Sequence, residues 1–126
     1  MLGRGHLVAM LGTTQPDAAR AFFEETLGLT FVADHPHALI FQAENARLMV
    51  QKVETVTPPH GTALGWSVAD LRGVMKGLIA RGVTFERFEG MDQDKLGVWS
   101  PAGPDTGVAW FKDPDGNLLS LSTSGD

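Results

Sequence analysis

The chain of 126 residues contains no cysteine. It therefore cannot form disulfides, thiolate metal sites or a cysteine nucleophile. The absence fits a reducing compartment, and we expect a cytoplasmic location. No apolar run approaches the roughly 20 residues that a membrane span needs. The first residues, MLGRGHLVAMLGTTQPD, show no small-residue cleavage site and lead into a helix signal, so we expect neither a signal peptide nor a membrane partner.

The sequence also lacks a concentration of basic residues. Its formal net charge is −5 and its pI is about 5.2, with lysines and arginines scattered along the chain. A phosphate-backbone partner is therefore not expected, and we predict no binding of nucleic acid. No Ser-His-Asp arrangement and no phosphate-binding glycine loop can be found. An apolar fraction of 43% and a charged fraction of 20% are typical of one globular domain with an ordinary core.

The first half of the sequence predicts one strand, one helix and three further strands. An apolar run over residues 5–11 reads as a buried strand. The helix begins at Pro16, with Gln15 or, better for its hydroxyl, Thr14 as its cap, and it ends at Gly28. Its apolar stripe is expected to include Ala18 and Phe22, with Ala19 facing away. Strand-like segments follow at 30–34, 38–44 and 46–53.

The second half repeats this order after a proline-rich stretch, VETVTPPHG, at 53–61. A strand at 62–68 precedes a helix that Asp70 caps and Gly82 ends. Its expected apolar face is Leu71, Val74, Leu78 and Ile79. Strands are predicted at 83–88, 107–113 and 117–122, with Trp66 and Trp110 in the core. In the long loop before residue 107, the acidic residues Glu89, Asp92 and Asp94 are interpreted as a solvated face.

The two halves resemble each other in sequence as well as in order. GLTF at 28–31 matches GVTF at 82–85, and FQAENARLMV at 41–50 matches FKDPDGNLLS at 111–120. An internal repeat with strands adjacent in sequence predicts an α+β fold of two βαβββ modules. We expect a single domain over 1–126, with a first module at 1–53, a linker at 54–61 and a second module at 62–126.

Three segments resemble the vicinal oxygen chelate superfamily, which groups glyoxalase I, extradiol dioxygenases, fosfomycin-resistance proteins and bleomycin-binding proteins. They are AFFEETLGLTF at 21–31, LGWSVADLRGVMKGLIARGVTF at 64–85 and WFKDPDGNLLSLS at 110–122. The resemblance implies two βαβββ modules whose sheets curl around a shared cleft, and it favours a homodimer. It does not imply a particular reaction, because function depends on the site.

The same resemblance places four metal ligands on strands of the two modules. In this sequence those positions hold Val8, Gln51 (or Val50), Ala63 and Ser120. Valine and alanine have no donor atom, and glutamine and serine are weak neutral donors, so no cofactor is expected at the usual site. Binding of a divalent metal remains an alternative, at a displaced site that uses His6 and His60. The alternative is that these histidines, like His35 and His37, are solvated or belong to turns.

Alternation along each strand defines the residues that would face the cleft. The expected ligand-binding residues are small, apolar or neutral: Met10, Met49, Gln51, Gly65, Ser67, Ser120 and Ser122. Trp99, in the long loop, is a candidate lid or stacking platform for the ligand, or it packs back on the sheet. A pocket for a small molecule and a filled core are both compatible with these side chains.

Two functions remain open. The first is a metal-free binding protein that holds a small, mostly apolar organic molecule, for example to sequester a toxic compound. The second is a divergent enzyme: a metal-dependent lyase or dioxygenase with displaced ligands, or a metal-free isomerase that uses Gln51 and serine hydroxyls. The sequence favours binding over catalysis, and it indicates neither a catalytic residue nor the identity of the ligand.

Overall fold

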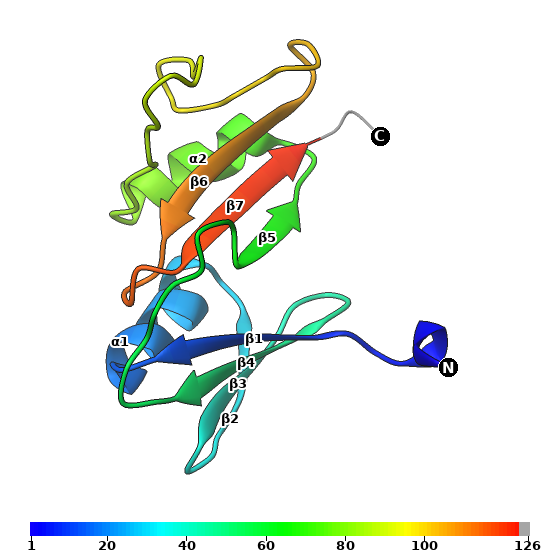
Figure 1. Ribbon diagram of the computed structural model, residues 1–126, viewed down its shortest axis with the longest axis vertical. Coiled ribbons are helices and arrows are strands. Elements are labelled where there is room, and N and C mark those ends of the chain that lie inside the picture. The colour runs from blue at the N-terminus through cyan, green and yellow to red at the C-terminus, as the bar shows by residue number, and fades with distance from the viewer. Residues whose placement is uncertain (124–126) are drawn as a thin grey trace. The chain divides into compact units, whose positions relative to one another are not determined.

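The computed structural model of the protein describes residues 1–123. The chain forms two compact units, Met1–Thr57 and Pro58–Asp126, each with its own sheet and helix (Figure 1). The fold is the α+β fold that the sequence predicts. Within the described residues, no helix has the length and apolar character needed to cross a membrane.

The first unit has the predicted order of strand, helix and three strands. Its elements are η1 (Leu2–Arg4), β1 (Val8–Thr13), α1 (Pro16–Arg20), the π-helical η2 (Ala21–Thr26), β2 (Thr30–Asp34), β3 (Ala38–Gln42) and β4 (Arg47–Lys52). The sheet order is β1-β4-β3-β2, with β1 parallel to β4 and the other pairs antiparallel. The parallel pair requires a crossover, and α1 and η2 lie on the chain between β1 and β2.

The helix of this unit begins at Pro16 as predicted, but its cap differs. Gln15 is the N-cap and makes no capping hydrogen bond with its side chain, so the preference for Thr14 is wrong. The Gln15 N–H instead donates to the Thr13 Oγ1 atom over 3.0 Å. Gly28 ends the helix with a φ angle of 79°, a conformation that glycine adopts without steric cost.

The buried face of this helix is also different from the prediction. Ala19 and Phe23 are buried, whereas Ala18 and Phe22 are only partly covered. The Phe23 ring lies 5.6 Å from the Phe41 ring of β3 and so fixes which side of the helix faces the sheet. Two adjacent phenylalanines leave this choice open in the sequence, because either can continue an apolar stripe.

The second unit contains β5 (Leu64–Ser67), α2 (Leu71–Ala80), β6 (Gly107–Lys112) and β7 (Leu118–Thr123). The sheet order is β5-β7-β6, with β5 parallel and β6 antiparallel to β7. The predicted strand at 83–88 is not formed. Phe85 makes an isolated bridge to Phe111 of β6, but the Phe88 N–H donates to the Gln93 side chain over 2.8 Å, so the pairing stops short of a continuous strand.

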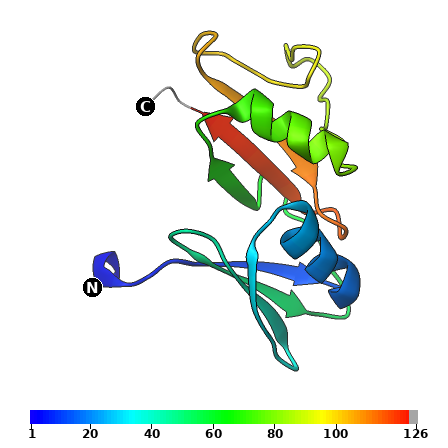
Figure 2. The ribbon, with the colours of Figure 1, turned by 180° about the vertical axis from the view of Figure 1, so that it is seen from behind.

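The helix α2 crosses one face of this sheet (Figure 2). Asp70 caps it as predicted, and its Oδ1 atom accepts from the Gly73 N–H over 3.0 Å. Gly82 ends it with a φ angle of 95°. The buried residues are Leu71, Met75 and Leu78, whereas the predicted Val74 and Ile79 are exposed. Spacings of three and four residues align the buried side chains, and Val74 and Ile79 flank that stripe.

Candidate functional site

The first sheet has one buried face and one face that carries the predicted residues. Leu11, Leu48 and Val50 are buried, whereas Met10 on the alternate face is 57% exposed. Met10 lies opposite Met49 in the parallel pair of β1 and β4. Gln51 follows two residues after Met49 and lies opposite Gly12. Alternation along the two strands therefore brings Met10, Met49 and Gln51 to a common face.

The second sheet has the same division between its faces. Its buried face carries Ala109, Phe111, Leu119 and Leu121, and Trp66 joins them with its ring stacked 6.4 Å from that of Phe111. The other face, which we call the open face, holds the predicted small residues. Gly65 lies opposite Ser120, and Ser67 lies opposite Ser122.

A group of three aromatic side chains extends this open face. The Trp110 ring lies 6.1 Å from the Trp99 ring and 5.4 Å from the Phe88 ring, which meets it edge-on. Trp110 is opposite Ser120, so the rings adjoin the small residues. All three aromatic residues are half-buried. We call Phe88, Trp99 and Trp110 the aromatic platform.

Only part of this platform follows from the sequence. The prediction that Trp110 lies in the core is wrong, because this residue alternates with the buried Ala109 and Phe111 and so faces the other side. Its Nε1–H donates to the Thr62 Oγ1 atom over 3.1 Å. Phe88 was assigned to a strand that does not form. Alternation along the strand could have predicted that Trp110 faces away from the core. No feature of the sequence near Phe88 predicts that its ring contacts Trp110.

The loop that carries Trp99 is attached to the sheet by its backbone. Trp99 and Val108 exchange both hydrogen bonds, each 2.9 Å long. Trp99 is therefore fixed beside β6 and packs on the sheet, with part of its ring exposed. Gln93 holds the neighbouring turn, since its Nε2 atom donates to the carbonyl oxygens of Glu86 and Gly97.

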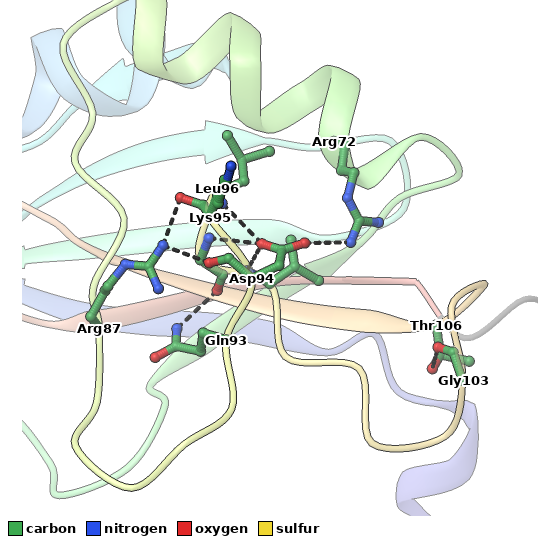
Figure 3. Close-up of polar contacts among 10 residues, drawn as sticks. Arg72, Arg87, Gln93, Asp94, Lys95, Leu96, Gly103 and Thr106 are labelled. Atoms are coloured by element: carbon green, nitrogen blue, oxygen red, sulfur yellow. Dashed lines mark hydrogen bonds and ion pairs between the residues drawn. The ribbon is translucent and has the colours of Figure 1, made fainter.

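Asp94 organises the rest of this loop (Figure 3). Its Oδ1 atom accepts from the N–H groups of Leu96, Gly97 and Val98 over 3.0, 3.0 and 2.9 Å. Its Oδ2 atom accepts from Arg72 of α2 over 2.6 Å. Asp94 is exposed, as the interpretation of a solvated face expects, but its carboxylate also holds the loop together, which the sequence did not indicate. Partial burial alone would raise the pKa of Asp94, but the hydrogen bonds outweigh it and lower the pKa.

A family model matches residues 4–121, almost the whole chain, under the description Glyoxalase/Bleomycin resistance protein/Dioxygenase superfamily. The chain belongs to this superfamily. No curated protein sequence matches the chain. Solved structures share the fold of this chain at low sequence identity.

Among them is a glyoxalase family protein from Bacillus anthracis, with a TM-score of 0.75 and 17% identity over 96% of this chain and 95% of that one. TnmS3, an antibiotic binding protein from a Streptomyces species, has a TM-score of 0.67 and 21% identity over 92% of both chains. Lactoylglutathione lyase from Agrobacterium tumefaciens has a TM-score of 0.67 and 17% identity over 96% of this chain and 94% of that one. At these identities the likeness shows the fold alone.

The residues at the four expected metal positions do not fit a divalent ion. Val8 and Ala63 have no donor atom, and the donors of Gln51 and Ser120 are neutral. Among residues 1–123, no group of three or more His, Asp or Glu side chains could hold an ion. His60 is exposed in the segment before β5, and His6 is exposed and lines a pocket in the first unit.

Proposed function

We propose that this superfamily member binds a small, mostly apolar organic molecule without a metal ion. The aromatic platform beside Gly65 and Ser120 is the observation that carries this proposal. Half-exposed tryptophan rings offer apolar surface that stays in contact with water until a ligand covers it. Covering such a surface favours binding, and offset or edge-on contact with another ring adds to it.

The polar groups of the open face favour a neutral ligand. Ser67, Ser120 and Ser122 supply hydroxyl groups, and no charged side chain belongs to the predicted set. Sites for small molecules are usually apolar surfaces with a few polar groups that fix the orientation of the ligand. The description of TnmS3 as an antibiotic binding protein supports binding as one function that this fold performs.

The exposed face of the first sheet is a separate candidate surface for an apolar ligand. Met10 and Met49 lie opposite each other there, and Gln51 adds one amide. Methionine side chains adapt to varied ligand shapes because they are unbranched and flexible. A Met10→Ala variant tests this face independently of the aromatic platform, since the two sets of residues share no member.

The binding experiment measures tryptophan fluorescence and thermal stability while planar aromatic compounds, including antibiotics, are added. A ligand selective for the native state raises the unfolding temperature as its concentration increases. Trp99→Ala should weaken the binding of such a ligand about tenfold or more, a loss of about 1.4 kcal/mol. The matched control is Trp66→Phe, which changes a tryptophan on the buried face and should leave affinity unchanged. Equal affinity in both variants would contradict the proposal.

The metal-free state is tested separately. Protein purified without chelators is analysed for metal and then titrated with Ni²⁺, Mn²⁺, Zn²⁺ and Fe²⁺. We expect less than stoichiometric metal and a flat response, because the four expected ligand positions lack suitable donors. Stoichiometric binding that is lost in His6→Ala or His60→Ala would instead establish a displaced site and favour the divergent enzyme.

We further propose a homodimer in the cytoplasm, with both modules in one glyoxalase-like domain. Light scattering after size-exclusion chromatography measures the mass of the particle against the 13.5 kDa of one chain. A mass of one chain at all concentrations would exclude the dimer.

A further inference from the structure

A pocket of about 360 Å³ in the first unit is lined by residues before and at the start of β1 and by residues of the turn between β3 and β4. Its lining includes His6, Leu7, Val8, Asn45, Ala46 and Arg47. Its volume is within the range of sites for small molecules. We propose that this pocket binds the carboxylate of a small organic acid.

Arg47 is held in place for this role. The Gln42 Nε2 atom donates to the carbonyl oxygens of Ala43 and Ala46 over 2.7 and 3.0 Å, which fixes the Gln42 side chain. The Gln42 Oε1 atom then accepts from the Arg47 Nε atom over 3.2 Å. This bond uses the Nε–H and leaves both terminal nitrogens of the guanidinium for a carboxylate. A preoriented guanidinium loses less side-chain entropy when it binds an anion.

The positive charge of Arg47 has no acidic partner within residues 1–123. The ion pairs there involve other cations: Arg20, Lys52, Arg72 and Lys112. Glu44, in the same turn as Asn45, is exposed and does not line the pocket. The pocket therefore holds one fixed positive charge that a ligand can neutralise. A guanidinium and a carboxylate match in geometry and form strong, charge-assisted hydrogen bonds.

The remaining lining residues define the body of the ligand. His6 and Asn45 add polar side chains with N–H donors. Leu7 and Val8 are 89% and 45% exposed and, with Ala46, form an apolar wall in contact with water. A ligand with a carboxylate at one end and a short apolar chain would satisfy Arg47 and cover this wall. Covering it contributes favourable free energy that an inorganic anion cannot supply.

The test compares hexanoate with hexanamide, its neutral counterpart, by NMR titration of the ¹⁵N-labelled full chain. Hexanoate should shift the amide signals of His6, Asn45 and Arg47 in a saturable way. Hexanamide should bind at least about tenfold more weakly than hexanoate, because it carries no negative charge to pair with Arg47. Equal affinity of the two compounds would overturn the proposal, and this comparison needs no variant.

Variants and a second anion sharpen the result. Arg47→Met should weaken hexanoate binding about tenfold, whereas Arg81→Met, which removes an exposed arginine of the second unit, should leave it within about twofold. Inorganic phosphate should bind more weakly than hexanoate. If phosphate binds as tightly as hexanoate, the pocket is an unspecific anion site, and the proposal of an organic acid as its ligand is wrong.

The outcome is independent of the aromatic platform. The pocket shares no residue with the aromatic platform, so Trp99→Ala should leave hexanoate binding unchanged. Failure of hexanoate to bind, with aromatic ligands still bound in a Trp99-dependent way, would reject only the pocket. The reverse pattern would reject only the platform.

Discussion

Gly65 lies directly opposite Ser120 in the parallel pair of β5 and β7, and the Ser120 hydroxyl oxygen occupies the space that a Cβ atom on Gly65 would need. Ser120 is also the position that the family resemblance assigns to a metal ligand. In this chain its hydroxyl group packs against a glycine. The two residues therefore act as one packing unit on the open face of the sheet.

Gly65→Ala should lower the free energy of unfolding by about 1 kcal/mol, because the Ser120 hydroxyl must leave its rotamer. The other atoms near an added Cβ, the Ser120 carbonyl oxygen and Cβ, would be 3.4 and 3.7 Å away, which is ordinary contact. In a Ser120→Ala background the same substitution should therefore cost almost nothing. Urea unfolding of wild type, the two single variants and the double variant gives the coupling energy between the two positions. An equal cost of Gly65→Ala in both backgrounds would contradict this packing.

Two glycines of the α2 region should respond to alanine in opposite directions. Gly77 lies within the helix, and an added Cβ would meet only the Arg81 side chain at 3.9 Å, so Gly77→Ala should stabilise the protein by about 0.5–1 kcal/mol. Gly82 has a φ angle of 95°, so Gly82→Ala should destabilise it by about 1 kcal/mol or more. Thermal and urea unfolding measure both. Changes of the same sign would be inconsistent with this helix end.

Asp94→Ala should destabilise the second unit by about 1–2 kcal/mol, because three backbone N–H groups lose their acceptor. The matched control is Asp92→Ala, an exposed residue of the same loop, which should change stability by less than about 0.5 kcal/mol. Trp99 fluorescence should shift in the Asp94 variant alone, since that loop carries Trp99. Equal effects of the two substitutions would show that Asp94 does not organise the loop.

The same carboxyl group gives a pH dependence with a definite sign. Its pKa is lowered in the folded protein, so the stability it contributes is present above the unfolded pKa of about 3.9. That contribution is lost as the pH falls through the folded pKa. Wild type should therefore lose stability relative to Asp94→Ala on acidification, as measured by urea unfolding at a series of pH values. A constant difference would contradict the assignment.

Asp113 is a buried carboxyl group that accepts several hydrogen bonds. Its Oδ1 atom accepts from the N–H groups of Asp115 and Asn117 over 3.0 and 2.9 Å, and its Oδ2 atom accepts from the Asn117 side chain over 2.9 Å. Asp113→Ala should cost about 2–3 kcal/mol, because these buried donors lose their partner. Asp105→Ala, at an exposed position, is the control and should be nearly neutral.

Burial raises the pKa of Asp113 above its ordinary value despite these hydrogen bonds. The folded state then binds a proton more tightly than the unfolded state. Wild type should gain stability relative to Asp113→Asn as the pH falls from the folded pKa toward about 3.9. A loss of relative stability over that interval, measured by urea unfolding, would contradict the raised pKa.

Much of the fold could be predicted from local signals. The ends of both helices follow from residues whose effect depends on the nearest turn: Pro16, Gly28, Asp70 and Gly82. The order of elements predicted for the first unit is confirmed, and in the second unit only the strand at 83–88 is missing. Alternation predicted which side chains share a face of each sheet. These features were accessible because each depends on backbone chemistry within a few residues.

Other features depended on contacts between distant segments. The helix of the first unit faces its sheet with Phe23 because that ring meets Phe41, which the spacing of apolar residues does not specify. The segment at 83–88 pairs with β6 only around Phe85, because the Gln93 side chain accepts from the Phe88 N–H. Asp94 looks like any exposed acid in sequence, yet Arg72 and three backbone N–H groups converge on it.

The sequence by itself therefore determined the α+β class, the order of elements in the first unit and the chemical character of the exposed sheet faces. These follow from composition, periodicity and the conformational preferences of glycine and proline. Only the tertiary structure decided that Phe88, Trp99 and Trp110 meet, and that Arg47 is held beside a pocket with His6. The physical reason is that strand register and loop closure bring these groups together, and neither leaves a signature in the residues adjacent to them.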